Sequence, residues 1–323
     1  MTQLKNDYRP EMTNAGIEAS YPVTVTDEYG NTRETHITGE RPLTIYVDKQ
    51  EIVTLMTLGK YPELLVIGYL HNQGFIKKAA EIKAVQVDWD VDSAVVVTRN
   101  GSQNWEEKLN KRTVTTGCGQ GTVFGDIMEN LDEINLPRPT LAQSSFYRLL
   151  HNIRLYNEVY KKSGAVHGCA LCKGEDIEVF IEDVGRHNAT DAIAGHMLLE
   201  GINGSDKLFY TTGRLTSEMV IKVAQMGIPV LFSRAGITQM GMELSKKLGV
   251  TTIARAGGKH FLVYSGADTL IFDAKPAEKT GSRLETSSKD NEESTLRERR
   301  RKAELERSEE RRVGKECRSR WSP

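Results

Sequence analysis

Apolar and polar residues alternate through most of the first hundred positions of the chain. Residues 21–37 alternate on both sides of a turn signal, Glu28-Tyr29-Gly30-Asn31, and this arrangement predicts a β-hairpin. Further alternating segments predict strands at residues 43–47, 51–55 and 82–98. We expect the last three segments to form one sheet, since period-two alternation is typical of half-buried strands.

A single helix interrupts these strands. Pro62 begins it, an apolar stripe with helical spacing follows, and Gly74 ends it. The pattern therefore predicts a small β-rich α+β domain at residues 20–112. Residues 1–19 show no periodicity, and we interpret them as a flexible arm.

The second half of the chain changes to alternating helices and strands. Ser144 or Ser145 is expected to cap one long helix whose apolar face runs from Phe146 to Tyr160. The segments that follow predict strands at 177–181, 208–211, 228–232, 250–254 and 261–264, and helices at 187–199, 216–226 and 238–248. Such β–α repeats predict a layered α/β domain at residues 113–277, with helices on both faces of the sheet. A ligand site is expected at the carboxyl ends of its strands.

The composition changes after residue 277. Residues 278–323 contain 14 basic and 11 acidic residues and almost no large aliphatic ones, whereas the preceding residues contain 29 basic and 33 acidic ones. We interpret this segment as a disordered, charged tail or a solvated helix. Its last residues, 313–323, fit no folding pattern, and a non-native origin of the tail is an open alternative.

The overall charge excludes several classes of protein. With 43 basic and 44 acidic residues the chain has no global footprint for nucleic acid or a membrane surface. No apolar segment reaches transmembrane length. Four cysteines are too few for a disulfide scaffold in 323 residues, so we expect a cytoplasmic, reducing environment.

Cys118 lies in the glycine-rich segment Thr115-Thr116-Gly117-Cys118-Gly119-Gln120-Gly121. The glycines permit left-handed backbone conformations and keep bulk away from the sulfur. Loop amides directed at the thiol would lower its pKa, and the thiolate is the reactive form. The pattern therefore indicates a reactive cysteine, with a small buried cysteine in a turn as the alternative.

Two strand-to-helix loops of the second half contain more polar side chains than a core requires. In the first, Asp183 is placed to cap the helix or orient His187, and Arg186 is placed to contact a phosphate. In the second, Gly213 and Arg214 suit an anion cradle of backbone N–H groups. A structural ion pair with helix capping is the alternative for the first loop, and capping alone explains Thr216, Ser217 and Glu218 of the second.

A third loop, Ala254-Arg255-Ala256-Gly257-Gly258-Lys259-His260, places two glycines between two cations. The glycines allow the backbone to approach a ligand, and the cations place positive charge beside it. If the strand order brings the three loops together, Arg214, Arg255 and Lys259 converge on the phosphates of a large polyanion such as a nucleotide pyrophosphate.

The segment His167-Gly168-Cys169-Ala170-Leu171-Cys172 contains a C-x-x-C pair beside a histidine. Zinc, a redox role and simple burial of both thiols are the three interpretations. The chain contains one such pair, and the His-x-Glu and Pro-Cys signature of zinc deaminases is missing, so we predict no metal site. Cys169 and Cys172 are three apart on a predicted strand and should face opposite sides of it.

Taken in order, these motifs resemble the formate dehydrogenase accessory sulfurtransferase family, FdhD. The resemblance extends from about Glu40 to Asp273. It rests on Glu40-Arg41-Pro42-Leu43, Gly68-Tyr69-Leu70, Gly74-Phe75-Ile76, the Cys118 loop, Gly164-Ala165-Val166-His167, Glu182 to Asn188 with Asp191, Gly213-Arg214, Ser217-Glu218, Lys222 and Gly227-Ile228-Pro229-Val230.

The resemblance implies a fold and a function. Family members have a larger domain similar to cytidine deaminases and take sulfur as a persulfide from a cysteine desulfurase. They transfer it to the bis-molybdopterin guanine dinucleotide form of the molybdenum cofactor, which formate dehydrogenase then receives. The family's loop usually reads Cys-Gly-x-Cys-Gly. Here Gly121 replaces its second cysteine, so the persulfide role maps to Cys118.

The resemblance also implies the cofactor-binding residues of the predicted α/β domain. They are Ile253, Ala254, Arg255, Ala256, Gly257, Gly258 and Lys259. The chemistry of the other two loops adds Arg214, His187 and Arg186 to the predicted cofactor contacts. An assembly chaperone that binds the cofactor without sulfur chemistry is the main alternative function, and a deaminase-like hydrolase is a third. A homodimer is an open possibility for the assembly.

Overall fold

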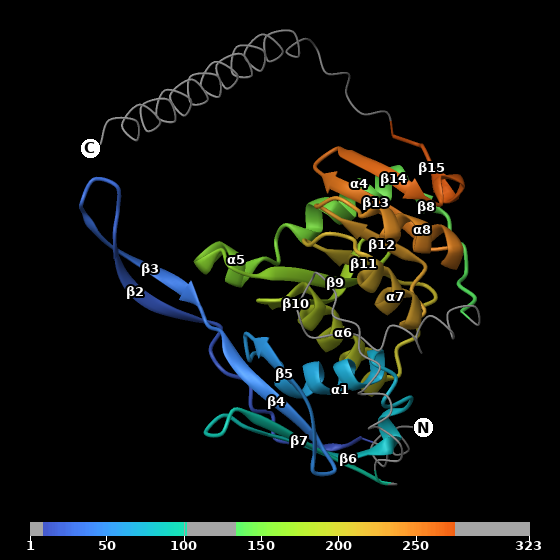
Figure 1. Ribbon diagram of the computed structural model, residues 1–323. Helices are drawn as coiled ribbons and strands as arrows, with labels where there is room; N and C mark the ends of the chain where they lie inside the picture. Colours follow the sequence, from blue (N-terminus) through green and yellow to red (C-terminus); the bar gives the residue numbers. More distant parts are fainter. Residues whose placement is uncertain (1–8, 100, 102–133, 275–323) are drawn as a thin grey trace, which may run out of the picture. The chain divides into compact units, whose positions relative to one another are not determined.

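The computed structural model describes residues 9–99, 101 and 134–274. Figure 1 shows two mixed β-sheets with helices between them, and these helices include α1 (Pro62–Asn72) and α6 (Arg186–Glu200). One continuous hydrophobic cluster contains residues of both sheets and of both helices. The expectation of a mixed α/β protein is confirmed, and the resemblance to cytidine deaminases stays a prediction.

The first sheet has five strands. In spatial order they are β1 (Glu11–Met12), β6 (Ile82–Asp88), β7 (Ser93–Thr98), β4 (Arg41–Val47) and β5 (Gln50–Thr57). The predicted alternation is visible in β4, where Leu43, Ile45 and Val47 are buried and the residues between them are partly exposed. Helix α1 lies on the buried side of this sheet.

The second sheet has six strands. In spatial order they are β10 (Asp176–Asp183), β9 (His167–Lys173), β11 (Leu208–Thr211), β12 (Val230–Ser233), β13 (Thr251–Gly257) and β14 (His260–Ser265). Strands β11, β12 and β13 are parallel to one another, while the outer pairings are antiparallel. The carboxyl ends of the three parallel strands therefore meet at one edge of the sheet.

Helices cover both faces of the second sheet, as the repeats predict. On one face lie α6, α7 (Ser217–Gln225) and α8 (Gln239–Leu248), whose apolar residues join the large cluster. On the other face lies α4 (Gln143–Ile153), and its Phe146 packs edge-on against Phe232 of β12. The remaining short elements are β8 (Leu141–Ala142), β15 (Leu270–Ile271), η1 (Ala79–Glu81) and η3 (Ala267–Thr269).

The predicted hairpin is confirmed as β2 (Ser20–Thr26) paired with β3 (Thr32–Thr38). Its turn forms because Asp27 accepts hydrogen bonds from the backbone N–H groups of Tyr29 and Asn31. The hairpin extends away from both sheets (Figure 1), and most of its side chains are exposed.

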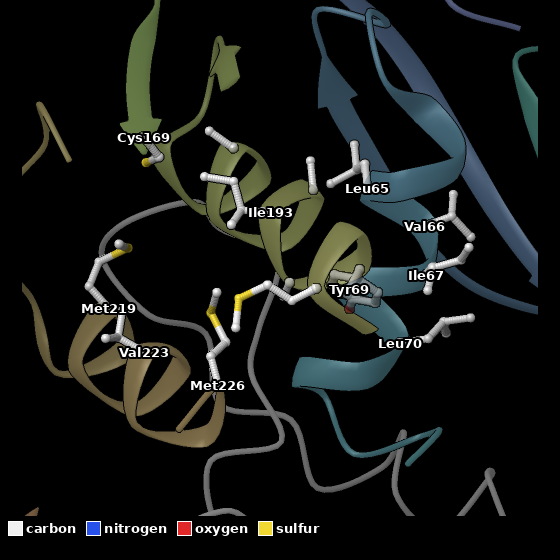
Figure 2. Packing of buried hydrophobic residues seen from close by; sticks show 14 of the residues in the cluster. Leu65, Val66, Ile67, Tyr69, Leu70, Cys169, Ile193, Met219, Val223 and Met226 are labelled. Carbon is white, nitrogen blue, oxygen red and sulfur yellow. The ribbon is translucent and has the colours of Figure 1, made fainter. Parts of the chain in front are cut away.

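Helices α1 and α6 cross at two glycines. A Cβ atom at Gly68 would lie 1.6 Å from the carbonyl oxygen of Asp191, and one at Gly195 would lie 2.1 Å from that of Leu64. Only glycine permits the two backbones to come this close. Figure 2 shows α1 on one side of α6, with Met219 of α7 and Met226, the residue after α7, directed at α6 from the other side.

The predicted flexible arm is wrong for residues 9–19. Strand β1 pairs with β6, and Trp89 donates its indole N–H to the backbone oxygen of Ala15 at 2.6 Å. Glu63 at the start of α1 accepts hydrogen bonds from Thr13 and from the N–H of Ala15. These partners lie more than forty positions away in the chain, so the local pattern contained no sign of them.

The single long helix predicted after residue 144 is also wrong. Helix α4 ends at Ile153, and a separate short helix, α5, covers Glu158–Ser163. At the break Asn157 donates to the carbonyl oxygen of Ile153, and the buried carboxylate of Glu182 on β10 accepts from the N–H groups of Val159 and Tyr160. The carboxylate satisfies N–H groups at the start of α5 that a helix leaves without intrahelical partners.

The predicted serine cap of α4 is replaced by a different contact. The N-cap position is Ala142, and no side chain caps it. Ser144 instead donates both its hydroxyl and its backbone N–H to Asp273, at 2.6 and 2.8 Å. This contact joins the start of α4 to the end of the described chain.

The glycine crossing gives a direct test of the packing. Gly195→Ala should reduce the free energy of unfolding by about 3 kcal/mol or more, because the new methyl group meets a backbone oxygen that cannot move alone. The gain in helix propensity, at most about 1 kcal/mol, is smaller. Urea denaturation measures the difference.

Gly236→Ala is the matched control for this substitution. A Cβ atom at Gly236 has no atom within 4 Å, and its φ is not positive. The control should unfold like the unsubstituted protein. Equal stability of Gly195→Ala and the control would contradict the close crossing.

Candidate functional site

The edge of the second sheet where β11, β12 and β13 end is bordered by two adjacent pockets. The larger, which we call the His167 pocket, has a volume of about 500 Å³. The smaller, which we call the Arg154 pocket, has a volume of about 310 Å³. Asn157, Tyr160 and Arg234 line both, and we refer to the two together as the joint pocket.

The break between α4 and α5 shapes this site. Asn157 lies in the break and Tyr160 in the short helix after it. A continuous helix would point these residues elsewhere, since side chains of a helix turn by about 100° per residue. The Glu182 carboxylate, by capping α5, therefore positions one wall of the joint pocket.

Three cations line the joint pocket: Arg234, Arg154 and Lys161. All three are exposed. Among the described residues no carboxylate lies within ion-pair distance of any of them. Tyr210 lies beneath Arg234, and burial raises its pKa to about 12 although Arg234 acts in the opposite direction. The pocket thus presents positive charge that is not neutralised by the neighbouring described chain.

Arg234 was not among the predicted site residues, although the sequence contains a signal for it. Ser233-Arg234-Ala235-Gly236 repeats the Arg-Ala-Gly pattern of the predicted third loop. The two patterns lie at the ends of neighbouring parallel strands, where Phe232 pairs with Ile253. The backbone N–H of Arg255 donates to the oxygen of Ala235 at 2.8 Å, so the loops are in contact.

The residues of the predicted third loop separate into three groups. Ile253 and Ala254 are fully buried and belong to the cores on opposite faces of the sheet. Ala256 and Gly257 line the Arg154 pocket. The others, which are Arg255, Gly258 and Lys259, are not among its described lining residues. Arg255 has a φ of 52° at a bulge and exposes its side chain.

The first and second loops meet each other as predicted, but their side chains point inward. Arg186 is only 6% exposed and packs on Gly213, where a Cβ atom would lie 2.3 Å from the Arg186 Cδ. His187 is 4% exposed, and its Nε2 lies 3.2 Å from a carboxylate oxygen of Glu218. Arg214 is exposed. Of the three predicted cofactor contacts in these loops, therefore, Arg214 alone presents its side chain to solvent.

Asp183 does not orient His187. Its carboxylate accepts hydrogen bonds from the Thr57 hydroxyl at 2.7 Å, from the N–H of Leu58 and from the side chain of Asn188. It also accepts from the N–H of Gly185, the N-cap residue of α6. Asp183 therefore joins the start of α6 to strand β5 of the first sheet.

A buried ion pair links α6 to α7 and α1. Lys222 of α7 donates to both carboxylate oxygens of Asp191 at 2.7 Å, and Asn72 of α1 donates to one of them at 2.7 Å. Burial raises the pKa of Asp191, and Lys222 acts in the opposite direction. These motif residues stabilise the helix layer rather than the pocket.

The two described cysteines lie on opposite faces of β9, as their spacing predicts. Cys169 faces the α6 side and Cys172 the α4 side, and both are fully buried. Burial raises the pKa of Cys169 to about 11 and that of Cys172 further. Facing opposite ways, the two thiols cannot share a metal ion or form a disulfide. Cys118 and its loop lie outside the described residues.

Two kinds of feature are missing from the part of the chain that the structure describes. No group of three or more His, Cys, Asp or Glu side chains in that part of the chain is placed to hold a metal ion. Within the same ranges, no helix combines the length and the apolar character that crossing a membrane would require.

The fold and the pocket define an α/β protein with a basic edge, and comparison with known proteins gives the family. Residues 38–271 match the model of the FdhD/NarQ family, and the chain belongs to that family. A sulfur carrier protein FdhD from Listeria monocytogenes serotype 4b is 31% identical over 73% of this chain and 92% of its own length. One from Bacillus pumilus is 30% identical over 70% of this chain and 87% of its own.

A solved structure is similar across most of the fold. The crystal structure of a putative formate dehydrogenase accessory protein from Desulfotalea psychrophila superposes with a TM-score of 0.61 at 26% identity. The match covers 80% of this chain and all of that one. The predicted resemblance to FdhD is thus confirmed by sequence and by structure.

His187 gives a testable pH dependence of stability. Burial lowers its pKa in the folded protein, although Glu218 acts in the opposite direction. As the pH falls below about 6.5 the unfolded chain takes up this proton first, so the stabilisation present above that pH is lost. His187→Gln should make the fall in unfolding free energy shallower, by up to about 1.4 kcal/mol per pH unit between roughly pH 6.5 and 5.

The control for this measurement is His36→Gln, because His36 is exposed on β3. Burial also raises the pKa of Asp183 and Asp191, but these groups remain in both proteins and cancel in the difference. Identical slopes for His187→Gln and the unsubstituted protein would show that His187 is not buried in its neutral form.

Proposed function

We propose that this protein is a sulfur carrier for formate dehydrogenase maturation. It accepts a persulfide on Cys118 from a cysteine desulfurase and transfers the sulfur to bis-molybdopterin guanine dinucleotide, which it binds as a substrate. The relatives named sulfur carrier protein FdhD support a sulfur-carrier role, and the similar structure of a putative formate dehydrogenase accessory protein supports a role in formate dehydrogenase maturation.

One observation of the structure supports cofactor binding most directly: the joint pocket has three cations and no described carboxylate partner for them. A protein surface normally interleaves both signs of charge, and a concentration of one sign attracts a ligand of the other. Arginine also matches the geometry of phosphate oxygens with paired hydrogen bonds. A guanine nucleotide with a pyrophosphate is a ligand of this kind.

The shape of the joint pocket agrees with such a ligand. Its two parts have volumes in the range usual for small-molecule sites, about 300–1,000 Å³. Gly257 leaves room beside the cations, because a Cβ atom there has no neighbour within 4 Å. Tyr160 adds an exposed aromatic ring, and bases stack on such rings.

Sulfur acceptance by Cys118 is a thiol–persulfide exchange. The Cys118 thiolate attacks the outer sulfur of the desulfurase persulfide, a new sulfur–sulfur bond forms, and the desulfurase cysteine leaves as a thiolate. Neither described cysteine suits this step, since burial keeps Cys169 and Cys172 protonated. The flanking glycines of Cys118 allow a large donor protein to approach the sulfur.

The cysteine assignment is tested by mass spectrometry after incubation with a cysteine desulfurase and cysteine. The unsubstituted protein should gain one sulfur atom on the Cys118 peptide, and Cys118→Ala should gain none. Cys118→Ala should also fail to support formate dehydrogenase activity while still binding guanosine diphosphate.

The matched control is the double variant Cys169→Ala, Cys172→Ala, which should load sulfur like the unsubstituted protein because direct transfer needs no second thiol. Full formate dehydrogenase activity with Cys118→Ala would contradict the proposal and support the assembly chaperone. Failure of the folded double variant to load or transfer sulfur would show that a buried thiol takes part.

The pocket assignment is tested by charge reversal. Arg234→Glu should weaken the binding of guanosine diphosphate by roughly 1.5–3 kcal/mol, the usual contribution of a charged hydrogen bond. Arg255→Glu should have a smaller effect, since Arg255 is not among the described residues lining the pocket. Isothermal titration calorimetry at two salt concentrations measures both, and salt should weaken binding to the unsubstituted protein.

Arg148→Glu is the control for charge itself, because Arg148 is exposed on α4 and contacts Glu175 away from the pocket. Its affinity should match that of the unsubstituted protein. Equal losses of guanosine diphosphate affinity in Arg234→Glu and Arg148→Glu would contradict binding in the joint pocket. An affinity that does not change with salt concentration would contradict it as well.

A further inference from the structure

His167 is the first residue of β9 and lines the His167 pocket, where its side chain is half-buried. Its Nδ1 lies 3.2 Å from the hydroxyl oxygen of Thr212, and the same oxygen accepts the backbone N–H of Gly168 at 3.1 Å. Because that oxygen already accepts one hydrogen bond, its own proton can be donated to Nδ1. The neutral imidazole then carries its proton on Nε2.

The Nε2 side of the ring has no hydrogen-bond partner among the described residues. In the tautomer in which Thr212 donates to Nδ1, the neutral ring can therefore donate one hydrogen bond to a ligand through Nε2. The described lining of the His167 pocket contains one cation, Arg234, and no carboxylate. A phosphate oxygen is the acceptor that this environment favours.

Titratable and charged groups from several elements surround His167. They are Arg186 and His187 at the start of α6, Arg214 after β11, Arg234 after β12, and Asp183, which pairs with His167 across β9 and β10. Burial, Arg186 and Arg214 together lower the pKa of His167. The ring is therefore neutral in the free protein at neutral pH.

We propose that His167 contacts a phosphate group of the nucleotide ligand through Nε2 and takes up a proton when that ligand binds. This inference rests on the proposed binding of a guanine nucleotide in the joint pocket. It adds a contact that no predicted site residue supplies, and it makes ligand binding depend on pH.

The direction of the pH dependence follows from linkage. A phosphate beside the ring adds negative charge, offsets the arginines and favours the imidazolium form. The bound protein therefore holds the His167 proton to a higher pH than the free protein does. Affinity rises as the pH falls through this interval, by up to about ten-fold per pH unit for one proton, and becomes constant below it.

Calorimetry with guanosine diphosphate tests the inference at pH values from roughly 5 to 8, in buffers of different ionisation enthalpy. The unsubstituted protein should take up a proton on binding, and His167→Gln should lose both this uptake and on the order of ten-fold in affinity. The phosphate itself titrates near pH 6. That contribution is present in both proteins, so the difference between them isolates His167.

Three variants separate a ligand contact from a structural role. The proton taken up goes to Nδ1, and the Thr212 hydroxyl, whose oxygen lies at 3.2 Å, must turn to accept it. Thr212→Ser keeps the hydroxyl and should keep the proton uptake, whereas Thr212→Val removes this acceptor and should reduce the uptake. His36→Gln, on the exposed hairpin, should behave like the unsubstituted protein. In the NMR spectrum the His167 ring should titrate at a higher pH with the nucleotide than without it.

Equal affinity and equal proton uptake in His167→Gln and the unsubstituted protein would overturn the inference. So would a His167 titration that the nucleotide does not shift. Absence of any nucleotide binding would overturn it too, together with the pocket assignment. Sulfur loading on Cys118, measured separately by mass, would still report on the sulfur-carrier proposal.

Discussion

The position of α6 between α1 and α7 is the constraint on which the other parts depend. One carboxylate, Asp191, receives hydrogen bonds from Lys222 of α7 and Asn72 of α1, and its own backbone oxygen faces Gly68 at the helix crossing. A buried ion pair of this kind adds little net stability, but loss of one partner leaves an uncompensated buried charge. The network therefore favours one arrangement of the three helices over others, and through α6 it sets the loops at the edge of the second sheet.

Charge is distributed in two ways in this protein, and the difference separates the residues that hold the scaffold together from those that line the joint pocket. In the helix layer buried carboxylates have described donors, as Asp183 has the Thr57 hydroxyl and Asp191 has Lys222. At the joint pocket the cations Arg154 and Arg234 have no such counterpart in the described chain. Neutralised charges hold the scaffold together and screen one another at a distance. Cations without a described carboxylate partner are available to interact with an anion that enters the pocket.

The pocket also depends on the contact between Glu182 and the start of α5, which ends the helix that the local sequence would continue. The segment after α4 has the apolar spacing of a continuing helix, yet Glu182 of β10 accepts the first N–H groups of α5 and a new helix begins. Asn157 and Tyr160 thereby line the space beside Arg234. A strand of the second sheet thus decides where the pocket wall lies, and it does so with a buried carboxylate.

Most elements, the order of the β–α repeats and the family could be read from residue patterns, because hydrophobic periodicity and glycine positions are local properties of a chain. The opposite orientation of Cys169 and Cys172 followed from the two-residue period of a strand in the same way. The residue patterns did not predict that Arg186 and His187 point inward or that Arg234 lines the pocket. A motif specifies residue types but not whether their side chains face the core or the solvent. Burial is decided by which segments pack together, so the ordered residues 9–19, the break before α5 and the cations of the joint pocket emerged only from contacts between residues distant in the chain.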